Sequence, residues 1–162
     1  MNRTLLSIIA AIVCLDRISK LLVAKFIPLE GGMDVIPGFF RLTHLENPGG
    51  AFSLLANEAS GWRAPLLIGF SIAALVVVLI LLWRNRQINA YTLALALVFA
   101  GALGNLWDRL ADGQVTDFLD FYLGSHHWYP FNIADSAIVT GAVLLLWSTL
   151  ISPRHKTAPE KD

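Results

Sequence analysis

Long apolar stretches alternate with short polar segments along the chain. The apolar stretches cover residues 4–26, 65–83, 91–107 and 132–151, and the second contains the uncharged run "LLIGFSIAALVVVLILLW". A helix that rises 1.5 Å per residue needs about 20 apolar residues to cross about 30 Å of hydrocarbon. The pattern therefore predicts four transmembrane helices in one membrane domain, residues 1–152, followed by a polar tail, residues 153–162.

The loops at residues 27–63 and 108–131 are expected on the same side of the membrane. Within the first loop, "FFRLTHLEN" (Phe39–Asn47) is rich in β-forming residues and is bounded by Pro37-Gly38 and Pro48-Gly49, which predicts a short strand. The next segment, "AFSLLANEASGW", resembles an amphipathic piece that lies on a membrane surface. The predicted fold class is thus an all-α membrane protein, a four-helix bundle with small elements outside the bilayer.

Composition supports a membrane protein. Of the 162 residues, 56% are hydrophobic and only 15% are charged, with a mean hydropathy of +0.61, whereas soluble domains average about 25% charged. The net charge of zero gives no electrostatic footprint for nucleic acid. The single Cys14 excludes an intramolecular disulfide and is expected to be a small buried side chain.

Basic residues predict the orientation. They gather before the first stretch, between the second and third, and after the fourth, and cytoplasmic loops carry an excess of Lys and Arg. Both termini are therefore expected in the cytoplasm. The first stretch also has the charged start and apolar middle of a cleavable signal peptide. However, Val13 is bulky where cleavage needs a small residue, and Asp16, Arg17 and Lys20 continue the same helix, so retention is expected.

Polar residues interrupt the apolar stretches at one depth. Asp16 and Lys20 are four positions apart and can pair on one helix face. Asn105, Asp108 and Arg109 follow an i, i+3, i+4 pattern near the end of the third stretch, after the small Gly101 and Gly104. Asn132 and Asp135 open the fourth, and Asp117 and Asp120 lie just before it. Each could be structural, as a helix cap or as an ion pair such as Asp108 with Arg109. Their common depth, in the outer half of the bilayer, instead predicts a site.

Paired carboxylates are the chemistry that fits best. Ser19 and Lys20 are helix neighbours that point about 100° apart, Ser136 has no evident base, and the histidines lack the spacing of metal ligands. Two carboxylates in contact share one proton, so one can activate water while the other acts as an acid. Asp117 and Asp135 are the best pair, although pattern alone leaves Asp120 and Asp108 open. No metal or cofactor is expected.

Five ordered stretches make the sequence similar to the lipoprotein signal peptidases, or signal peptidase II. They are "DRISK", "NPGGAF", "GALGNLWDR", "VTDFLDF" and "FNIADSAI". The likeness spans residues 15–143 and implies that Asp117 and Asp135 are the catalytic pair. Two small departures, Gly50 and Ala102, stand where many members have Ala and Gly.

The resemblance also implies the remaining roles. It assigns substrate contacts to Asn47, Gly49, Asn105, Arg109, Asn132 and Ala134, and structural roles to Asp16, Lys20 and Asp108. It implies a small extracytoplasmic β-sheet, a surface helix and a location in the bacterial inner membrane with the site near the outer leaflet. The expected partners are membrane lipid, diacylglyceryl-modified prolipoproteins, which would be cleaved just before the lipidated cysteine, and cyclic peptide antibiotics such as globomycin as inhibitors.

Two other classes of function remain as alternatives. A small proton-coupled transporter would use its membrane carboxylates as a relay, but it would need them in both leaflets, and the inner halves of the last three stretches contain none. A non-enzymatic membrane scaffold would tolerate Asp135→Asn.

Overall fold

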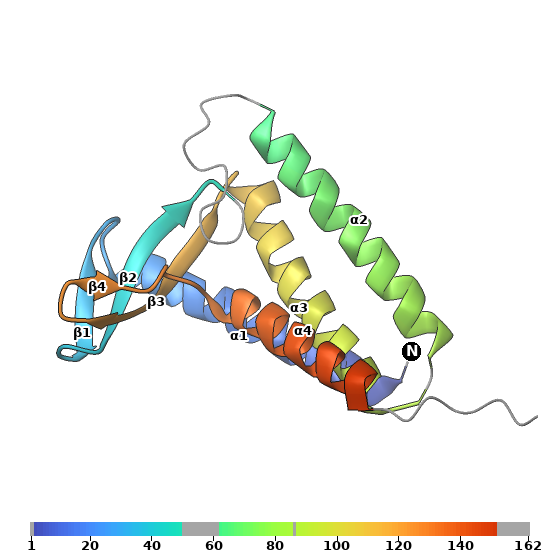
Figure 1. Cartoon of the computed structure of the whole chain (residues 1–162). Helices are drawn as coiled ribbons and strands as arrows, with labels where there is room; N and C mark the ends of the chain where they lie inside the picture. The colour runs from blue at the N-terminus through green and yellow to red at the C-terminus, as the bar shows by residue number, and fades with distance from the viewer. Residues whose placement is uncertain (1, 50–61, 86, 152–162) are drawn as a thin grey trace, which may run out of the picture.

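The computed structural model describes residues 2–49, 62–85 and 87–151. These residues form long helices and a small antiparallel sheet set at one end of the helices (Figure 1). In chain order the elements are α1 (Arg3–Phe26), β1 (Gly32–Ile36), β2 (Phe40–Asn47), α2 (Arg63–Arg84), α3 (Ala90–Ala111), β3 (Val115–Leu123), β4 (His126–His127) and α4 (Ile133–Ile151).

Each predicted apolar stretch forms a helix. Three helices among the described residues are long and apolar enough to cross a membrane: residues 64–84, 90–111 and 133–150. The 24-residue α1 is long enough, but Asp16, Arg17 and Lys20 interrupt its apolar run. The expected strand at Phe39–Asn47 is confirmed as β2. The expected surface segment after Gly50 and the polar tail lie outside the described residues.

The helix α3 is the centre of the bundle, because it packs against α1, α2 and α4. The other helices turn many large apolar side chains outward, among them Leu15, Phe70 and Val143, as expected of surfaces that face lipid. Cys14 belongs to this outward surface and is exposed. The prediction of a buried thiol was wrong because only one face of α1 packs against other helices.

Glycines allow α3 and α4 to approach closely. A Cβ on Gly101 would overlap the carbonyl oxygen of Ala134 and lie 2.8 Å from Ile138 Cγ1. A Cβ on Gly104 would lie 3.2 Å from Ala134 Cβ of α4 and 2.8 Å from Asp16 Oδ2 of α1. Small residues at such positions are the usual means of close helix packing in membranes.

We expect Gly101→Ala to destabilise the protein by about 2 kcal/mol, because the added methyl group meets backbone that cannot move without separating the helices. Gly69→Ala on α2 is the matched control, since its Cβ would meet nothing within 4 Å. Thermal unfolding in detergent should show a lower Tm for Gly101→Ala and no loss for Gly69→Ala. Equal Tm values for the two variants would contradict this packing.

The sheet has the strand order β1-β2-β3-β4. Leu42 pairs with Leu119 and Leu45 with Asp117, so β2 has one extra residue between these pairs, a β-bulge. Because side chains alternate along a strand, a shift of one residue changes which face they occupy. The bulge therefore puts Asn47 on the same face of the sheet as Asp117.

Candidate active site

Asp117 lies near the start of β3 and is 4% exposed. Two amides donate to its carboxylate: Asn47 Nδ2 to Oδ2 at 2.9 Å and Asn132 Nδ2 to Oδ1 at 2.8 Å. The β2 bulge places the first amide, and the start of α4 places the second. Asp117 is thus held from two directions.

Asp135 lies in the first turn of α4. Its Oδ1 accepts from Asn105 Nδ2 at 2.7 Å, and its backbone N–H donates to Asn132 Oδ1 at 2.9 Å. The second bond is that of a helix N-cap. Asn132, fully buried, therefore caps α4 with its oxygen and holds Asp117 with its nitrogen. One amide thus caps the helix and also links the two acidic residues.

Asp117 and Asp135 line the same cavity, which has a volume of about 390 Å³. Its walls come from β2, β3, the start of α4, the end of α3 and the segment between β4 and α4. The lining residues are Asn47, Asn105, Arg109, Val115, Asp117, Trp128, Tyr129, Pro130, Phe131, Asp135, Ser136, Ile138, Val139 and Thr140. The cavity is mostly apolar with a few polar groups, as is typical of small binding sites.

Burial raises the pKa of Asp117 from 3.8 to about 7. The negative charge of Asp135 adds to the rise in the Asp117 pKa, whereas the amides of Asn47 and Asn132 and the charge of Lys20 oppose it. Asp117 can therefore hold a proton close to neutral pH.

Arg109 borders the cavity on the α3 side. Its Nη2 donates to the Gly49 carbonyl at 3.2 Å, and its Nη1 donates to the Asn105 carbonyl at 3.3 Å. Gly49 in turn donates its N–H to Asn47 Oδ1 at 2.9 Å. The guanidinium thus ties the residues after β2 to α3 and brings a positive charge to the acidic site.

A cluster of four charges, of which Asp16, Lys20 and Asp108 are buried, lies next to Asn105 of the cavity wall. Lys20 Nζ is 2.8 Å from Asp16 Oδ2 and 2.6 Å from Asp108 Oδ2, and Arg17 Nη1 pairs with Asp108 Oδ1. Lys20 also donates to Asn105 Oδ1 at 3.3 Å. The expected i, i+4 pair of Asp16 and Lys20 is present. Asp108, however, pairs with Arg17 and Lys20 of α1 rather than with the neighbouring Arg109.

Of the other sequence candidates, Asp120 and Ala134 do not line the cavity, and Ser136 does. Asp120 pairs with His127, whose Nδ1 is 2.9 Å from both carboxylate oxygens. Ala134 is buried, donates its N–H to Asp16 Oδ1 at 2.9 Å and contacts the α3 glycines. Ser136 lines the cavity, but its hydroxyl donates to the Asn132 carbonyl. Within the described part of the chain, no group of three His, Cys, Asp or Glu side chains is arranged to hold a metal ion.

Comparison with known proteins gives the family. Residues 8–151 match the family described as Signal peptidase (SPase) II. The chain belongs to the signal peptidase II family. Curated lipoprotein signal peptidases agree. The protein of Solibacter usitatus is 41% identical to this chain, and the match covers 92% of this chain and 91% of the relative. The protein of Desulforapulum autotrophicum is 44% identical, with 87% of this chain and 88% of the relative covered. One protein of Yersinia pseudotuberculosis is 43% identical, with 93% of this chain and 89% of the relative covered.

Solved structures agree with the signal peptidase II assignment. Two structures described as a bacterial membrane enzyme have TM-scores of 0.83 and 0.82, at 29% and 28% identity. The first match covers 98% of this chain and 94% of the other, and the second covers 93% and 94%. The resemblance inferred from the five sequence stretches is confirmed at the level of the family.

Several residues that line the cavity were missed by sequence reasoning. Trp128, Tyr129 and Phe131 were placed in the loop at residues 108–131 and were given no role in the site. Val139 lies four positions after Asp135, and Thr140 lies four positions after Ser136, so each pair shares one side of α4. That helical spacing was the available signal.

Proposed function

We propose that this chain is a membrane aspartic endopeptidase that removes the signal peptide from diacylglyceryl-modified prolipoproteins just before the lipidated cysteine. The observation that carries the proposal is the cavity shared by Asp117 and Asp135, with one amide joining the two residues. Family membership supports the reaction class. The geometry supports these two acidic residues over Asp108 and Asp120, which pair elsewhere.

In the proposed mechanism the two carboxyl groups share one proton. The ionised carboxylate takes a proton from a water molecule as its oxygen attacks the scissile carbonyl carbon. The protonated carboxyl group gives its proton to the carbonyl oxygen. Collapse of the tetrahedral intermediate breaks the C–N bond and returns that proton, while the first residue protonates the leaving amine. The products are the signal peptide carboxylate and the amine of the lipidated cysteine.

The remaining polar residues have supporting roles in the proposal. Asn47 and Asn132 orient Asp117, Asn105 orients Asp135, and Arg109 with the Gly49 backbone binds substrate groups that are exposed where the signal helix unwinds. Asp16, Lys20, Asp108 and Ala134 hold the helices in register. No cofactor takes part.

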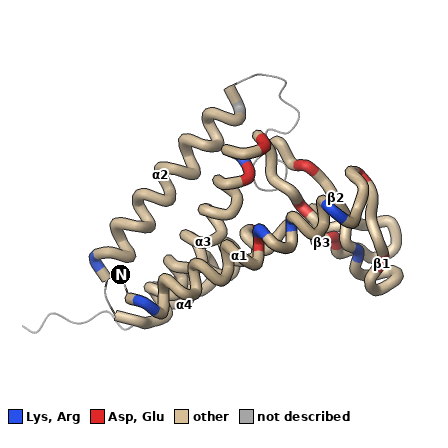
Figure 2. The backbone as a smooth tube through the Cα atoms, turned by 180° about the vertical axis from the view of Figure 1, so that it is seen from behind, with Lys and Arg blue, Asp and Glu red and all other residues tan. Residues whose placement is uncertain are grey.

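The proposed topology has four spans, with α1 as the first, and both termini in the cytoplasm of the bacterial inner membrane. In Figure 2 the helix ends near the N-terminus carry Lys and Arg positions, whereas the acidic positions lie toward the sheet together with further Lys and Arg. Buried pairing of its charges lets α1 cross despite them. The site then lies near the outer leaflet, where a lipid anchor holds the scissile bond. The same distribution speaks against a proton relay across both leaflets.

The test is cleavage by purified protein reconstituted in lipid. A lipidated prolipoprotein should be cleaved before the modified cysteine, with a kcat/KM about tenfold or more above that of the unlipidated precursor, because the anchor contributes binding energy. Globomycin should inhibit this cleavage. Equal rates for the two precursors would overturn the substrate assignment.

We expect kcat/KM to fall by about tenfold per pH unit above about pH 7, because loss of the shared proton removes the acid. The same raised pKa of Asp117 acts on stability. Between pH 3.8 and about 7 the folded state binds more protons than the unfolded state, so this group makes the protein less stable as pH rises. A kcat/KM profile that stays flat into the alkaline range would contradict the shared proton.

A further inference from the structure

A short connection forms one wall of the cavity. Residues 128–131, here called the strap, join β4 to α4, and all four line the cavity. The strap therefore links the hairpin that carries Asp117 with the helix that carries Asp135. Its position decides the shape of the cavity beside both acidic residues.

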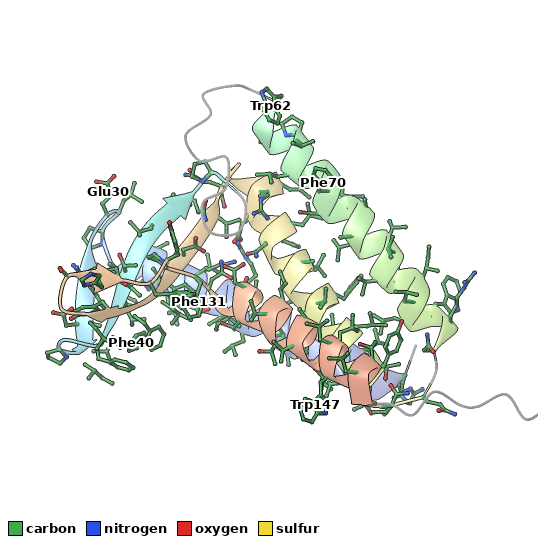
Figure 3. The ribbon with its side chains drawn as sticks, in the orientation of Figure 1. Glu30, Phe40, Trp62, Phe70, Phe131 and Trp147 are labelled. Atoms are coloured by element: carbon green, nitrogen blue, oxygen red, sulfur yellow. The ribbon has the colours of Figure 1, made fainter. Side chains whose placement is uncertain are left out.

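The end of the strap nearest α4 is anchored by backbone bonds. Leu119 donates its N–H to the Phe131 carbonyl at 2.8 Å, and Phe131 donates to the Leu119 carbonyl at 3.1 Å. The Phe131 ring stacks on Phe121, with centroids 5.9 Å apart, and Figure 3 shows Phe131 between the sheet and the helices. Asn132 and its bonds to Asp117 and Asp135 follow this anchor directly.

The end of the strap nearest β4 depends on a side-chain pair. The strand β4 has only two residues, His126 and His127, and Trp128 donates its N–H to the Phe121 carbonyl at 2.8 Å. Beside that bond the His127 ring donates from Nδ1 to the Asp120 carboxylate, 2.9 Å from each oxygen. The same ring stacks on Tyr122, with centroids 4.8 Å apart and planes 9° from parallel.

Asp120 has no direct path to the reaction. It lies three positions after Asp117 on β3, so alternation along the strand turns it to the opposite face. It is 5% exposed, and a buried carboxylate is costly unless it is paired and hydrogen-bonded. The bond to His127 meets that need, and it also fixes the residue just before the strap.

We propose that Asp120 and His127 are positioning residues that hold the strap as a substrate-binding wall of the cavity. The proposal rests on the proposed function, because it concerns how the same site takes its substrate. If the Asp120–His127 pair is broken, the end of the strap nearest β4 becomes more mobile. A smaller fraction of the molecules then has a complete cavity wall. Asn132 keeps its own anchors, so the acidic residues stay in place. Breaking the pair should therefore raise KM more than it lowers kcat.

The kinetic test compares Asp120→Ala and His127→Ala with the control His126→Ala on the neighbouring, exposed histidine. For the two test variants KM should rise about fivefold while kcat stays within about twofold of wild type. The control His126→Ala should match wild type in both KM and kcat. His127→Asn, whose amide can donate where the ring Nδ1 does, should have a KM between those of wild type and His127→Ala. An unchanged KM, or a fall in kcat alone, would overturn the inference.

A second measurement needs no substrate. Hydrogen exchange in the full-length protein should become at least about threefold faster in residues 126–131 of Asp120→Ala and stay unchanged in α3. The conservative Asp120→Asn, which keeps an acceptor, should lie between wild type and Asp120→Ala if the alanine variant folds poorly. Unchanged exchange in the strap would overturn the inference. Failure of wild type to cleave a lipidated precursor would instead overturn the proposed function, so the two failures are distinguishable.

Discussion

Asp135→Asn is expected to fold normally and to lose cleavage of the lipidated precursor by about 10³-fold or more. In the wild type Asn105 Nδ2 donates to Asp135 Oδ1 at 2.7 Å, and the oxygen of the new asparagine can accept the same bond. The substitution therefore keeps the local structure and removes only the acid. Positioned acid–base groups contribute about 10²–10⁴-fold each, and residues that act as a unit lose most of the rate when either is removed.

Asp117→Asn should be equally inactive, but its structural cost differs. Both carboxylate oxygens of Asp117 accept from amide groups, one from Asn47 and one from Asn132. The NH2 group of an asparagine at this position would face one of these amide donors, which leaves the two donors unpaired. Asp135→Asn is therefore the cleaner variant.

The matched control is Asp112→Asn, which changes an exposed acid at the end of α3. Single-turnover cleavage at saturating enzyme measures the chemical step. Substantial cleavage by Asp135→Asn, with Asp112→Asn unchanged, would contradict the assignment of Asp117 and Asp135 as the catalytic pair.

The helices were predictable because lipid imposes a length and a composition that are visible in the sequence. The apolar run at residues 65–83 was interpreted only as a membrane helix, and this run lies in α2. The helix caps were less visible, although Asn132 was named as a possible cap, and it is one. Family membership was also predictable, because five motifs in order leave little freedom.

Contacts between distant parts of the chain were not predictable. Arg17 and Asp108 are 91 positions apart, and nothing in their local sequence indicates that they pair. The β2 bulge, which turns Asn47 toward Asp117, is a register shift that leaves no compositional mark. The strand β3 was assigned to a loop because "VTDFLDFYL" is apolar on both faces and so lacks clean alternation. The main polar residues of the candidate site were thus foreseeable, whereas their hydrogen-bond geometry needed the fold.

The largest stability effect is expected for Lys20→Met. Lys20 is 3% exposed and lies between Asp16 and Asp108, both 1% exposed. Methionine has a similar length but no charge, so it leaves two buried carboxylates with only Arg17 beside one of them. Removing one partner from a buried ion pair typically costs about 3–5 kcal/mol. For a chain of this size that corresponds to a fall in Tm of about 10 °C.

This substitution also reaches the site, because the cluster joins three helices next to it. Asp16 accepts from the Ala134 N–H on α4, and Lys20 donates to Asn105 on α3, which in turn holds Asp135. We therefore expect Lys20→Met to lower activity below its Tm as well. Lys25→Met on the same helix is the control, since Lys25 is exposed and lies 5.3 Å from the Phe26 ring. Equal Tm values in detergent for the two variants would show that the buried charges do not hold the bundle. Loss of stability with full activity would instead separate the cluster from the catalytic geometry.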